Sequence, residues 1–185
     1  RGIDISLVGK TDEKQKFSMM GMFGYTYVDP ISLEPDLVYG KTGALQDSDE
    51  GEDLSYNSTS YNTEGNILKY RFKHLVKADL EFTYTNFVLG FSYRYYSKME
   101  NVDKSLGDIE VLTESAYPYF EKIKILNYWK VNDGYHIVDA RFSYKVKEKH
   151  RISLICNNLF NINYSLRPMK VESPRTTSIQ YIYSF

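Results

Sequence analysis

The stretch HLVKADLEFTYTNFVLGFSYRYYS, residues 74–97, decides how this chain folds. It holds two runs, His74–Tyr84 and Phe87–Ser97, in which apolar or aromatic residues alternate with polar ones. Alternation of period two is typical of β-strands, and Thr85-Asn86 between the runs predicts a tight turn. One resulting face holds Leu80, Phe82, Tyr84, Phe87, Leu89, Phe91, Tyr93 and Tyr95, and the other holds Asp79, Glu81, Thr83, Ser92, Arg94 and Tyr96. The stretch therefore predicts an antiparallel hairpin with an aromatic face and a polar face.

The same alternation recurs in five further segments, so the chain is expected to be all-β. These segments are Gly2–Gly9, Lys16–Val28, Gly134–Val146, His150–Asn157 and Thr176–Phe185. The expected strands average roughly 10 residues, which is longer than the usual soluble strand and close to the length that crosses a bilayer at a tilt. No helical segment of comparable quality is expected.

The connections between these strands alternate in length. Thr11–Gln15, Thr85-Asn86 and Lys147–Lys149 are short, whereas Asp29–Lys73, Lys98–Asp133 and Asn158–Arg175 are longer. If consecutive strands pair, every short turn lies at one edge of the sheet and every longer loop at the other. An antiparallel up-and-down transmembrane β-barrel has this pattern, with short periplasmic turns and long extracellular loops. Phe185, the last residue, is then expected at the periplasmic edge.

Composition fits this architecture without requiring it. Aromatic residues make up 16% of the 185 residues, with 18 Tyr, 10 Phe and one Trp. Tyr and Phe favour strands and Tyr suits a lipid–water boundary, but a soluble all-β domain with Tyr in its core would look similar. The sequence contains no run of about 18 apolar residues, so no membrane-spanning helix is predicted. The net charge of −1 gives no attraction to nucleic acid, and the single cysteine, Cys156, makes no internal disulfide.

Aromatic residues gather at both ends of the expected strands. Phe17, Tyr84, Phe87, Tyr144, Tyr183 and Phe185 fall near the short turns, and Tyr25, Tyr27, Tyr95 and Tyr135 fall near the long loops. Two such bands are typical of the interfacial girdles of a membrane barrel. The opposite faces carry Asp79, Glu81, Arg94, Asp139, Arg141 and Lys145, which suit either a wet lumen or an ordinary solvated surface.

Candidate substrate-binding residues come from the polar faces and from one loop. Arg94, Asp139 and Arg141 are the lumen candidates, and Tyr128 and Trp129 are the candidates in Lys98–Asp133. Loop aromatics contact ligands, and they also pack loops against one another. Residues 29–64 hold nine acidic residues against Lys41 alone, which is expected of a solvated loop. Their cluster at 47–53 lacks the tight oxygen spacing of a calcium loop.

Signatures of catalysis and of metal binding are missing. His74, His136 and His150 are isolated in sequence, and each is expected to be a polar residue at a strand end. The chain has no nucleophile elbow, no phosphate-binding glycine loop and no zinc-binding H-E-x-x-H motif. The sequence therefore predicts a protein that is not an enzyme and that uses no metal or cofactor.

Several segments together resemble the C-terminal barrel portion of TonB-dependent outer-membrane receptors, of the Bacteroidetes-like kind. The segments are Asn157-Asn158-Leu159-Phe160-Asn161 with Tyr164, Arg167-Pro168, Pro174-Arg175, Gly24–Asp29, Leu68–His74 and the strand ending in Phe185. They match the family's N-L-F-[ND]-x-x-Y element, proline- and arginine-containing outer loop, G-Y-T-Y-x-D strand end, L-x-x-R-P-x-H element and terminal aromatic strand. The chain departs from the L-x-x-R-P-x-H element at Phe72, where the family usually has proline.

The resemblance implies a barrel of 22 strands with an N-terminal plug, of which residues 1–185 supply about the last seven strands. It implies TonB-dependent uptake of a siderophore-, cobalamin-, peptide- or glycan-type nutrient across the bacterial outer membrane. The implied partners are outer-membrane lipid, the remaining barrel and plug, the TonB system, the barrel-assembly machinery and a surface lipoprotein. Tyr181, Tyr183 and Phe185 match the family's barrel-assembly signal.

Residues 1–185 contain no signal peptide, TonB box or plug, and seven is an odd number of strands, so a fragment is expected. Two other architectures are open. A complete eight-stranded barrel with a structural or adhesion role requires Leu68–Phe72 to form a strand and the N-terminal strand to pair with the last. A soluble β-sandwich that binds carbohydrate through loop aromatics requires the aromatic faces to be sealed between two sheets.

Overall fold

The computed structural model describes residues 1–185 apart from 13–15, 44–50, 117–125, 127–128, 130 and 148. Seven long strands dominate it: β1 (Gly2–Lys10), β2 (Phe17–Val28), β5 (His74–Tyr84), β6 (Phe87–Tyr96), β7 (Tyr135–Val146), β8 (His150–Asn157) and β9 (Thr176–Tyr183). All seven were expected from the alternation of residues, and the bounds differ by two residues at most. The all-β class is therefore confirmed.

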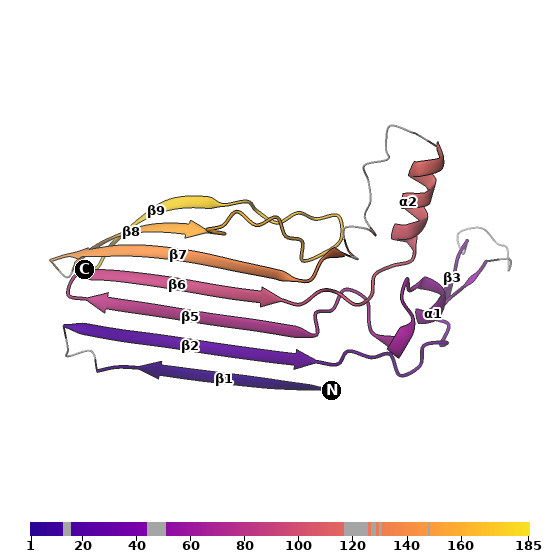
Figure 1. Cartoon of the computed structure of the whole chain (residues 1–185), viewed down its shortest axis with the longest axis horizontal. Coiled ribbons are helices and arrows are strands. Elements are labelled where there is room, and N and C mark those ends of the chain that lie inside the picture. The colour runs from indigo at the N-terminus through magenta and orange to yellow at the C-terminus, as the bar shows by residue number, and fades with distance from the viewer. Residues whose placement is uncertain (13–15, 44–50, 117–125, 127–128, 130, 148) are drawn as a thin grey trace.

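The seven strands form one antiparallel sheet in the order β1-β2-β5-β6-β7-β8-β9 (Figure 1). Each strand pairs with its neighbours along the chain, so the connections sort by length as expected. The short-turn edge holds the β1–β2, β5–β6 and β7–β8 connections and the C-terminus, and the loop edge holds the three long connections and the N-terminus. Phe185 is thus at the short-turn edge, as predicted.

The sheet has two edges, β1 and β9. Successive antiparallel strands reverse direction, so the first and the seventh strand run parallel to each other. Residues 68–72 do not form a strand, although Phe72 makes an isolated bridge to Met99. Both structural requirements of a complete eight-stranded barrel are therefore unmet in the described residues.

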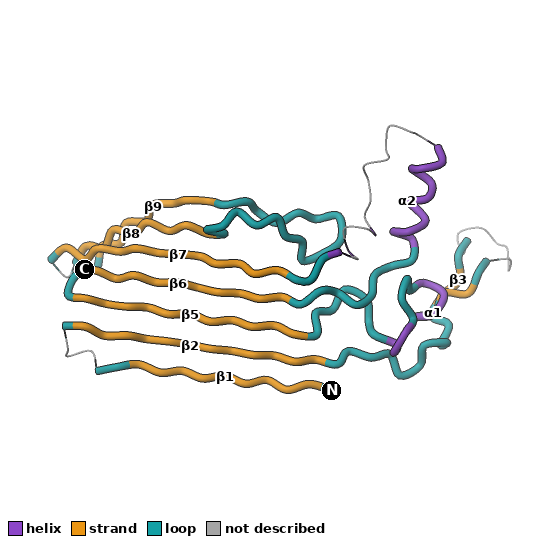
Figure 2. The backbone as a smooth tube through the Cα atoms, viewed as in Figure 1, coloured by secondary structure: helices purple, strands orange, loops and turns teal. Residues whose placement is uncertain are grey.

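The longer loops contain short elements of their own at the loop edge (Figure 2). These are β3 (Gly40–Lys41), β4 (Asp53–Leu54), α1 (Tyr56–Thr59), the 3₁₀ turn η1 (Glu64–Asn66) and α2 (Ser105–Ala116). The expectation that no comparable helix exists was wrong for α2. Its first turn buries Leu106, but Ile109, Val111 and Leu112 are exposed, so residues 105–112, the part of the helix whose side chains are described, bury no apolar stripe of helical period and the pattern was weak.

Buried side chains are few; most lie toward the loop edge, whereas Val88, Ser143 and Ser153 are buried on the polar face near the short turns. One cluster consists of Tyr135, Ile137 and Tyr164, with Tyr96 and Leu166 packed against it. Tyr56, Met99, Val102 and Leu106 are buried among the loops. Along most of the strands, by contrast, large apolar side chains are exposed, and this contrast defines the surface considered next.

Candidate functional site

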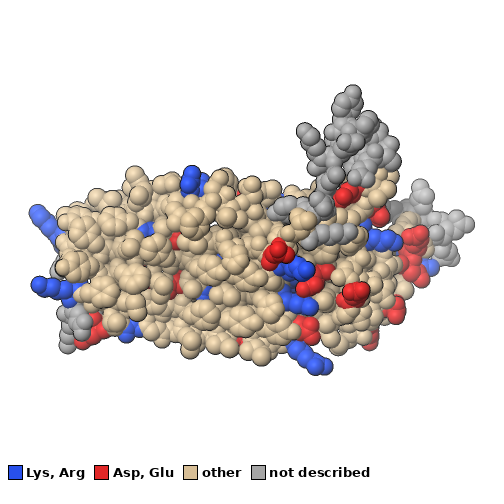
Figure 3. Space-filling view, viewed as in Figure 1, with Lys and Arg blue, Asp and Glu red and all other residues tan. Residues whose placement is uncertain are grey.

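The register gives the sheet one continuous apolar face. A single row across it contains Phe17, Tyr84, Phe87, Tyr144, Ile152 and Tyr181, and the next contains Met19, Phe82, Leu89, Phe142, Leu154 and Ile179. Ile179 is 77% exposed, Leu7 63% and Tyr84 59%. The strands seen in Figure 3 bear few charged side chains, and Lys, Arg, Asp and Glu gather toward the two ends. No second sheet seals this face among the described residues.

Ring contacts cluster at the ends of the apolar face. Near the short turns, Phe87 lies 4.9 Å from Tyr144 and 6.0 Å from Phe142 between ring centroids, and Phe17 lies 6.4 Å from Phe82. Toward the loop edge, Tyr25, Tyr27 and Tyr95 make ring contacts with histidines. The two expected aromatic bands therefore exist as packed groups; Tyr135 departs from its band, because it is buried on the opposite face.

The opposite, polar face carries ion pairs between strands, one joining neighbours and two crossing over β6 from β7 to β5. Arg94 Nη2 lies 2.7 Å from Asp139 Oδ2, joining β6 to β7. Arg141 Nη2 lies 2.9 Å from Glu81 Oε2, and Arg141 Nη1 lies 3.9 Å from Asp79 Oδ1. The three predicted lumen residues are thus brought together on one surface, but each is paired with an opposite charge.

Gly90 makes room for one of these ion pairs. It lies directly opposite Arg141 in the register, and a Cβ added there would lie 2.4 Å from Arg141 Nε. A residue with a side chain at position 90 would therefore push the arginine away from its place over the glycine. The position of the Arg141 side chain on the polar face therefore depends on the absence of a side chain at Gly90.

Three loops come together at the loop edge of the sheet, and Asn101 joins two of them. This side chain is fully buried, donates to Tyr56 Oη at 3.0 Å and to the Ile67 carbonyl at 2.8 Å, and accepts from the Asn62 backbone at 3.0 Å. The backbone carbonyl of Asn101 accepts a hydrogen bond from the Tyr70 backbone N–H at 3.0 Å. A buried amide with all these bonds holds residues 56–70 against the segment that leads into α2.

A charged contact reinforces the same junction. Lys69 Nζ lies 2.5 Å from Asp103 Oδ1, and the Tyr70 hydroxyl donates to Asp103 Oδ2. Burial and the hydrogen bond to Asp103 raise the pKa of Tyr70 to about 12. Burial opposes ionisation of Asp103, but the hydrogen bonds from Lys69 and Tyr70 and the Lys69 charge outweigh it and lower the pKa of this carboxyl from 3.8.

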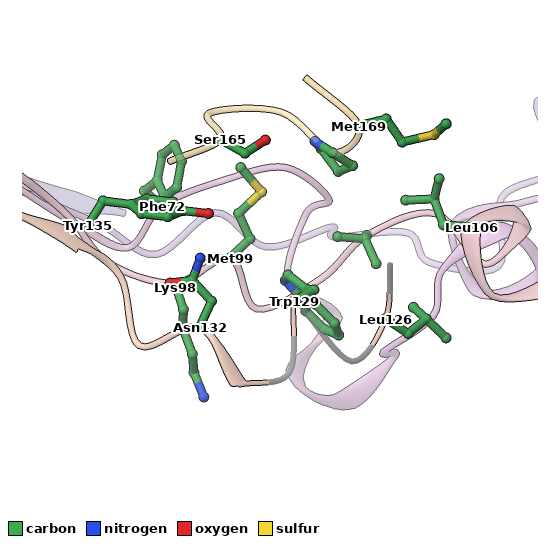
Figure 4. Close-up of a pocket in the computed structure, with 12 residues that line it drawn as sticks. Phe72, Lys98, Met99, Leu106, Leu126, Trp129, Asn132, Tyr135, Ser165 and Met169 are labelled. Atoms are coloured by element: carbon green, nitrogen blue, oxygen red, sulfur yellow. The ribbon is translucent and has the colours of Figure 1, made fainter. Parts of the chain in front are cut away.

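The loops enclose a small, mostly apolar cavity of about 50 Å³ (Figure 4). Its walls include Met99, Leu106, Leu126 and Trp129, together with Met169 from the loop that follows β8. Trp129 packs edge-on against Tyr61 at 5.9 Å, and its indole nitrogen is buried without a hydrogen-bond partner among the described residues. Trp129 therefore packs loops together and also leaves one N–H donor unused. Tyr128, the other candidate in this loop, lies outside the described residues, as do 47–50 of the acidic cluster.

The loop after β8 is organised by Asn158, in the segment that resembles the receptor family. Asn158 is buried; its side chain donates to the Ile162 carbonyl at 2.9 Å and accepts from the Ile162 backbone at 2.9 Å. Its φ of 52° and the φ of 53° at Asn161 are left-handed, a region that Asn tolerates better than most residues. The two asparagines therefore have a conformational reason to occupy these positions.

Asn101, Asn158 and the histidine contacts were not predicted as important from the sequence. A Tyr-x-Tyr pair lies on the strand next to each histidine, and this repeated sequence pattern could have predicted the histidine contacts. Among the described residues, no group of three or more His, Cys, Asp or Glu side chains is arranged to hold a metal ion. No described helix is both long enough and apolar enough to cross a bilayer.

No protein-family model matches the chain, and no significant match is found among curated proteins.

Proposed function

We propose that this chain forms part of the wall of a transmembrane β-barrel in a bacterial outer membrane, and that the barrel is a TonB-dependent nutrient receptor. The observation that supports this most strongly is the exposed apolar face, which extends unbroken over seven strands. Soluble monomeric proteins rarely expose contiguous apolar patches larger than a few hundred Å². A lipid bilayer is the environment in which such a surface, with rings toward both ends, is stable.

Strand length and the sorting of connections support the same proposal. The strands have 8 to 12 residues, which spans a bilayer at a tilt. Short turns at one edge and long loops at the other correspond to periplasmic and extracellular sides. A soluble β-sandwich would instead bury the apolar face against a second sheet.

The receptor assignment rests on the family resemblance described above and on the polar face and loops. In it, Arg94, Asp139 and Arg141 line the lumen, and Trp129, with Tyr128, contacts the nutrient from the extracellular loops. Tyr181 and Tyr183 on the apolar face, with Phe185 beyond them, act as the barrel-assembly signal. The plug, the TonB system and a surface lipoprotein complete the transport machinery, and the chain itself performs no bond chemistry.

Thiol labelling of neighbouring residues on opposite faces tests the membrane placement. In a Cys156→Ser background, single cysteines replace Thr83 and Ser178 on the polar face, and Phe82 and Ile179 on the apolar face. The full-length protein is labelled in intact membranes with a small, charged thiol reagent. Cysteines at 83 and 178 should react, and cysteines at 82 and 179 should react only after denaturation.

The two members of each pair are one residue apart, so they share depth and local stability and differ only in the face they occupy. Rapid labelling at 82 and 179 in intact membranes, with protection at 83 and 178, would contradict the proposal, because the apolar face would then be in contact with water. Equal labelling at all four positions would contradict it as well.

A further inference from the structure

Each of the three histidines lies against a Tyr-x-Tyr pair of the neighbouring strand, on the apolar face. His74 contacts Tyr25 and Tyr27, His136 contacts Tyr93 and Tyr95, and His150 contacts Tyr181 and Tyr183. In every case the first tyrosine hydroxyl is hydrogen-bonded to Nδ1, at 2.9, 2.7 and 2.6 Å respectively. The arrangement occurs three times with the same geometry and so reflects a common requirement.

The three clusters lie at two levels of the sheet. His74 and His136 are at the loop edge, and His150 is at the short-turn edge, opposite Val146 in the register. Ten residues of β7 separate His136 from Val146, which at about 3.4 Å per residue and a tilt of 35–45° corresponds to about 24–28 Å of bilayer. The apolar band of a membrane barrel is about 25 Å tall. On the proposed function, the clusters therefore lie at the two lipid–water boundaries.

The His150 cluster differs from the other two in its surroundings. Residues 145–151 contain Lys145, Lys147, Lys149 and Arg151 against the single acidic residue Glu148. Lys147 and Lys149 are exposed and directly precede His150. Positive charge at this edge attracts anions, whereas acidic residues are concentrated in the loops at the other end of the sheet (Figure 3).

We propose that His150, Tyr181 and Tyr183, together with Lys147 and Lys149, bind the phosphate of a lipid headgroup in the leaflet at the short-turn edge. In the tautomer in which the Tyr181 hydroxyl donates to Nδ1, the ring proton of His150 lies on Nε2, where it can be donated to a phosphate oxygen. The tyrosine rings hold the imidazole in place, and the lysines supply charge. The proposal rests on the membrane placement proposed above and adds a ligand to it.

Magic-angle spinning NMR on the full-length protein in phosphatidylglycerol vesicles tests this site. With ¹⁵N-labelled histidine, dipolar dephasing by ³¹P reports which Nε2 atoms lie beside a phosphate. We expect a dephased Nε2 signal that disappears in His150→Phe and weakens in Lys149→Gln. His136→Phe is the matched control, because it removes the same ring from the same kind of Tyr-x-Tyr contact away from the basic turn, and the signal should persist.

Two further measurements on the same material separate the outcomes. Magnetisation transfer from lipid acyl chains to the Phe142 ring tests the membrane placement by itself. If this transfer is observed but no Nε2 signal is dephased, the phosphate site is overturned and the proposed function stands. Vesicles of a phosphate-free glycolipid with added inorganic phosphate distinguish the source of the phosphate. Dephasing there would assign the site to free phosphate and overturn the lipid assignment. If His150→Phe does not fold, an absence of Nε2 dephasing in the unsubstituted protein would still overturn the site, and weakening of the signal in Lys149→Gln would still assign it to this site.

Discussion

Asn101 illustrates at the residue scale how the loop edge is held together. Its side chain bonds to Tyr56, Asn62 and Ile67 from a fully buried position, so alanine would leave several buried groups without partners. We expect Asn101→Ala to destabilise the loop junction by about 2–3 kcal/mol. Hydrogen exchange of the backbone amides in residues 56–70 measures the change, and faster exchange should be confined to the loop edge.

Asn163→Ala is the matched control for this prediction. Asn163 lies in a loop as well, but it is exposed. Its removal should leave exchange in residues 56–70 unchanged. Equal protection in Asn101→Ala and in the unsubstituted protein would show that packing, and not the buried amide, joins the loops.

Asp103 makes the same junction sensitive to acid. The pKa of this carboxyl is lower in the folded protein than its ordinary value of 3.8, so folding favours the ionised form. The stabilisation is therefore complete well above pH 4 and is lost as the pH falls through the lowered pKa. Limited proteolysis of the loops should accelerate below about pH 4. Asp103→Asn should be cleaved faster at neutral pH and should lack this acid-dependent increase; an unchanged acid profile in Asp103→Asn would contradict the assignment.

Gly90 and Arg141 couple two strands at the element scale. Because a Cβ at position 90 would lie 2.4 Å from Arg141 Nε, Gly90→Ala should displace the guanidinium and weaken its contacts with Glu81 and Asp79. We expect a loss of about 1–3 kcal/mol, measured as a lower unfolding midpoint in detergent. In an Arg141→Met background, whose side chain lacks the guanidinium, the same substitution should cost less.

Gly24→Ala provides the control on the same face. A Cβ at position 24 would have only ordinary contacts, at 3.9 and 4.0 Å from backbone oxygens. Its effect should be smaller and independent of Arg141. Additive costs for Gly90→Ala and Arg141→Met would show that the glycine is not needed to accommodate the arginine.

The strands were predictable from sequence and the loop elements were not, for a physical reason. A strand with one apolar face repeats every two residues, so β5, β7 and β8 can be located from local alternation alone. The buried residues of α2 among those described, Leu106 and Gly107, lie in its first turn, and the Asn101 and Asp103 contacts join residues more than 30 positions apart. Contacts between residues so far apart in the chain produce no periodic pattern in the sequence. The ion pairs of Arg94 and Arg141 were also unpredicted, because they depend on the register between strands.

At the scale of the whole molecule, the two open edges impose a requirement on the proposed barrel. β1 and β9 run parallel and each leaves backbone groups unpaired, which is costly in a bilayer. We expect these edges to pair with other strands of the full-length protein and not with each other. In a Cys156→Ser background, Ser153→Cys with Gln180→Cys should cross-link, because these residues face each other in β8 and β9.

Val8→Cys with Thr176→Cys joins the two edges in the same background. This pair should remain reduced under the oxidising conditions that cross-link the β8–β9 pair. Efficient cross-linking of residues 8 and 176 within one molecule would mean that seven strands close on themselves.

The paired polar face has a consequence for any solute that passes along it. On β5, β6 and β7 its central rows carry Lys77, Arg94 and Arg141 as cations and Asp79, Glu81 and Asp139 as anions, so the charges in these rows of the three strands sum to zero. Such a wall has no long-range field for counterions to screen. Raising the ionic strength should therefore change the passage of cations and anions along this wall of the proposed barrel equally little, and discrimination by charge falls to the acidic segments of the loops.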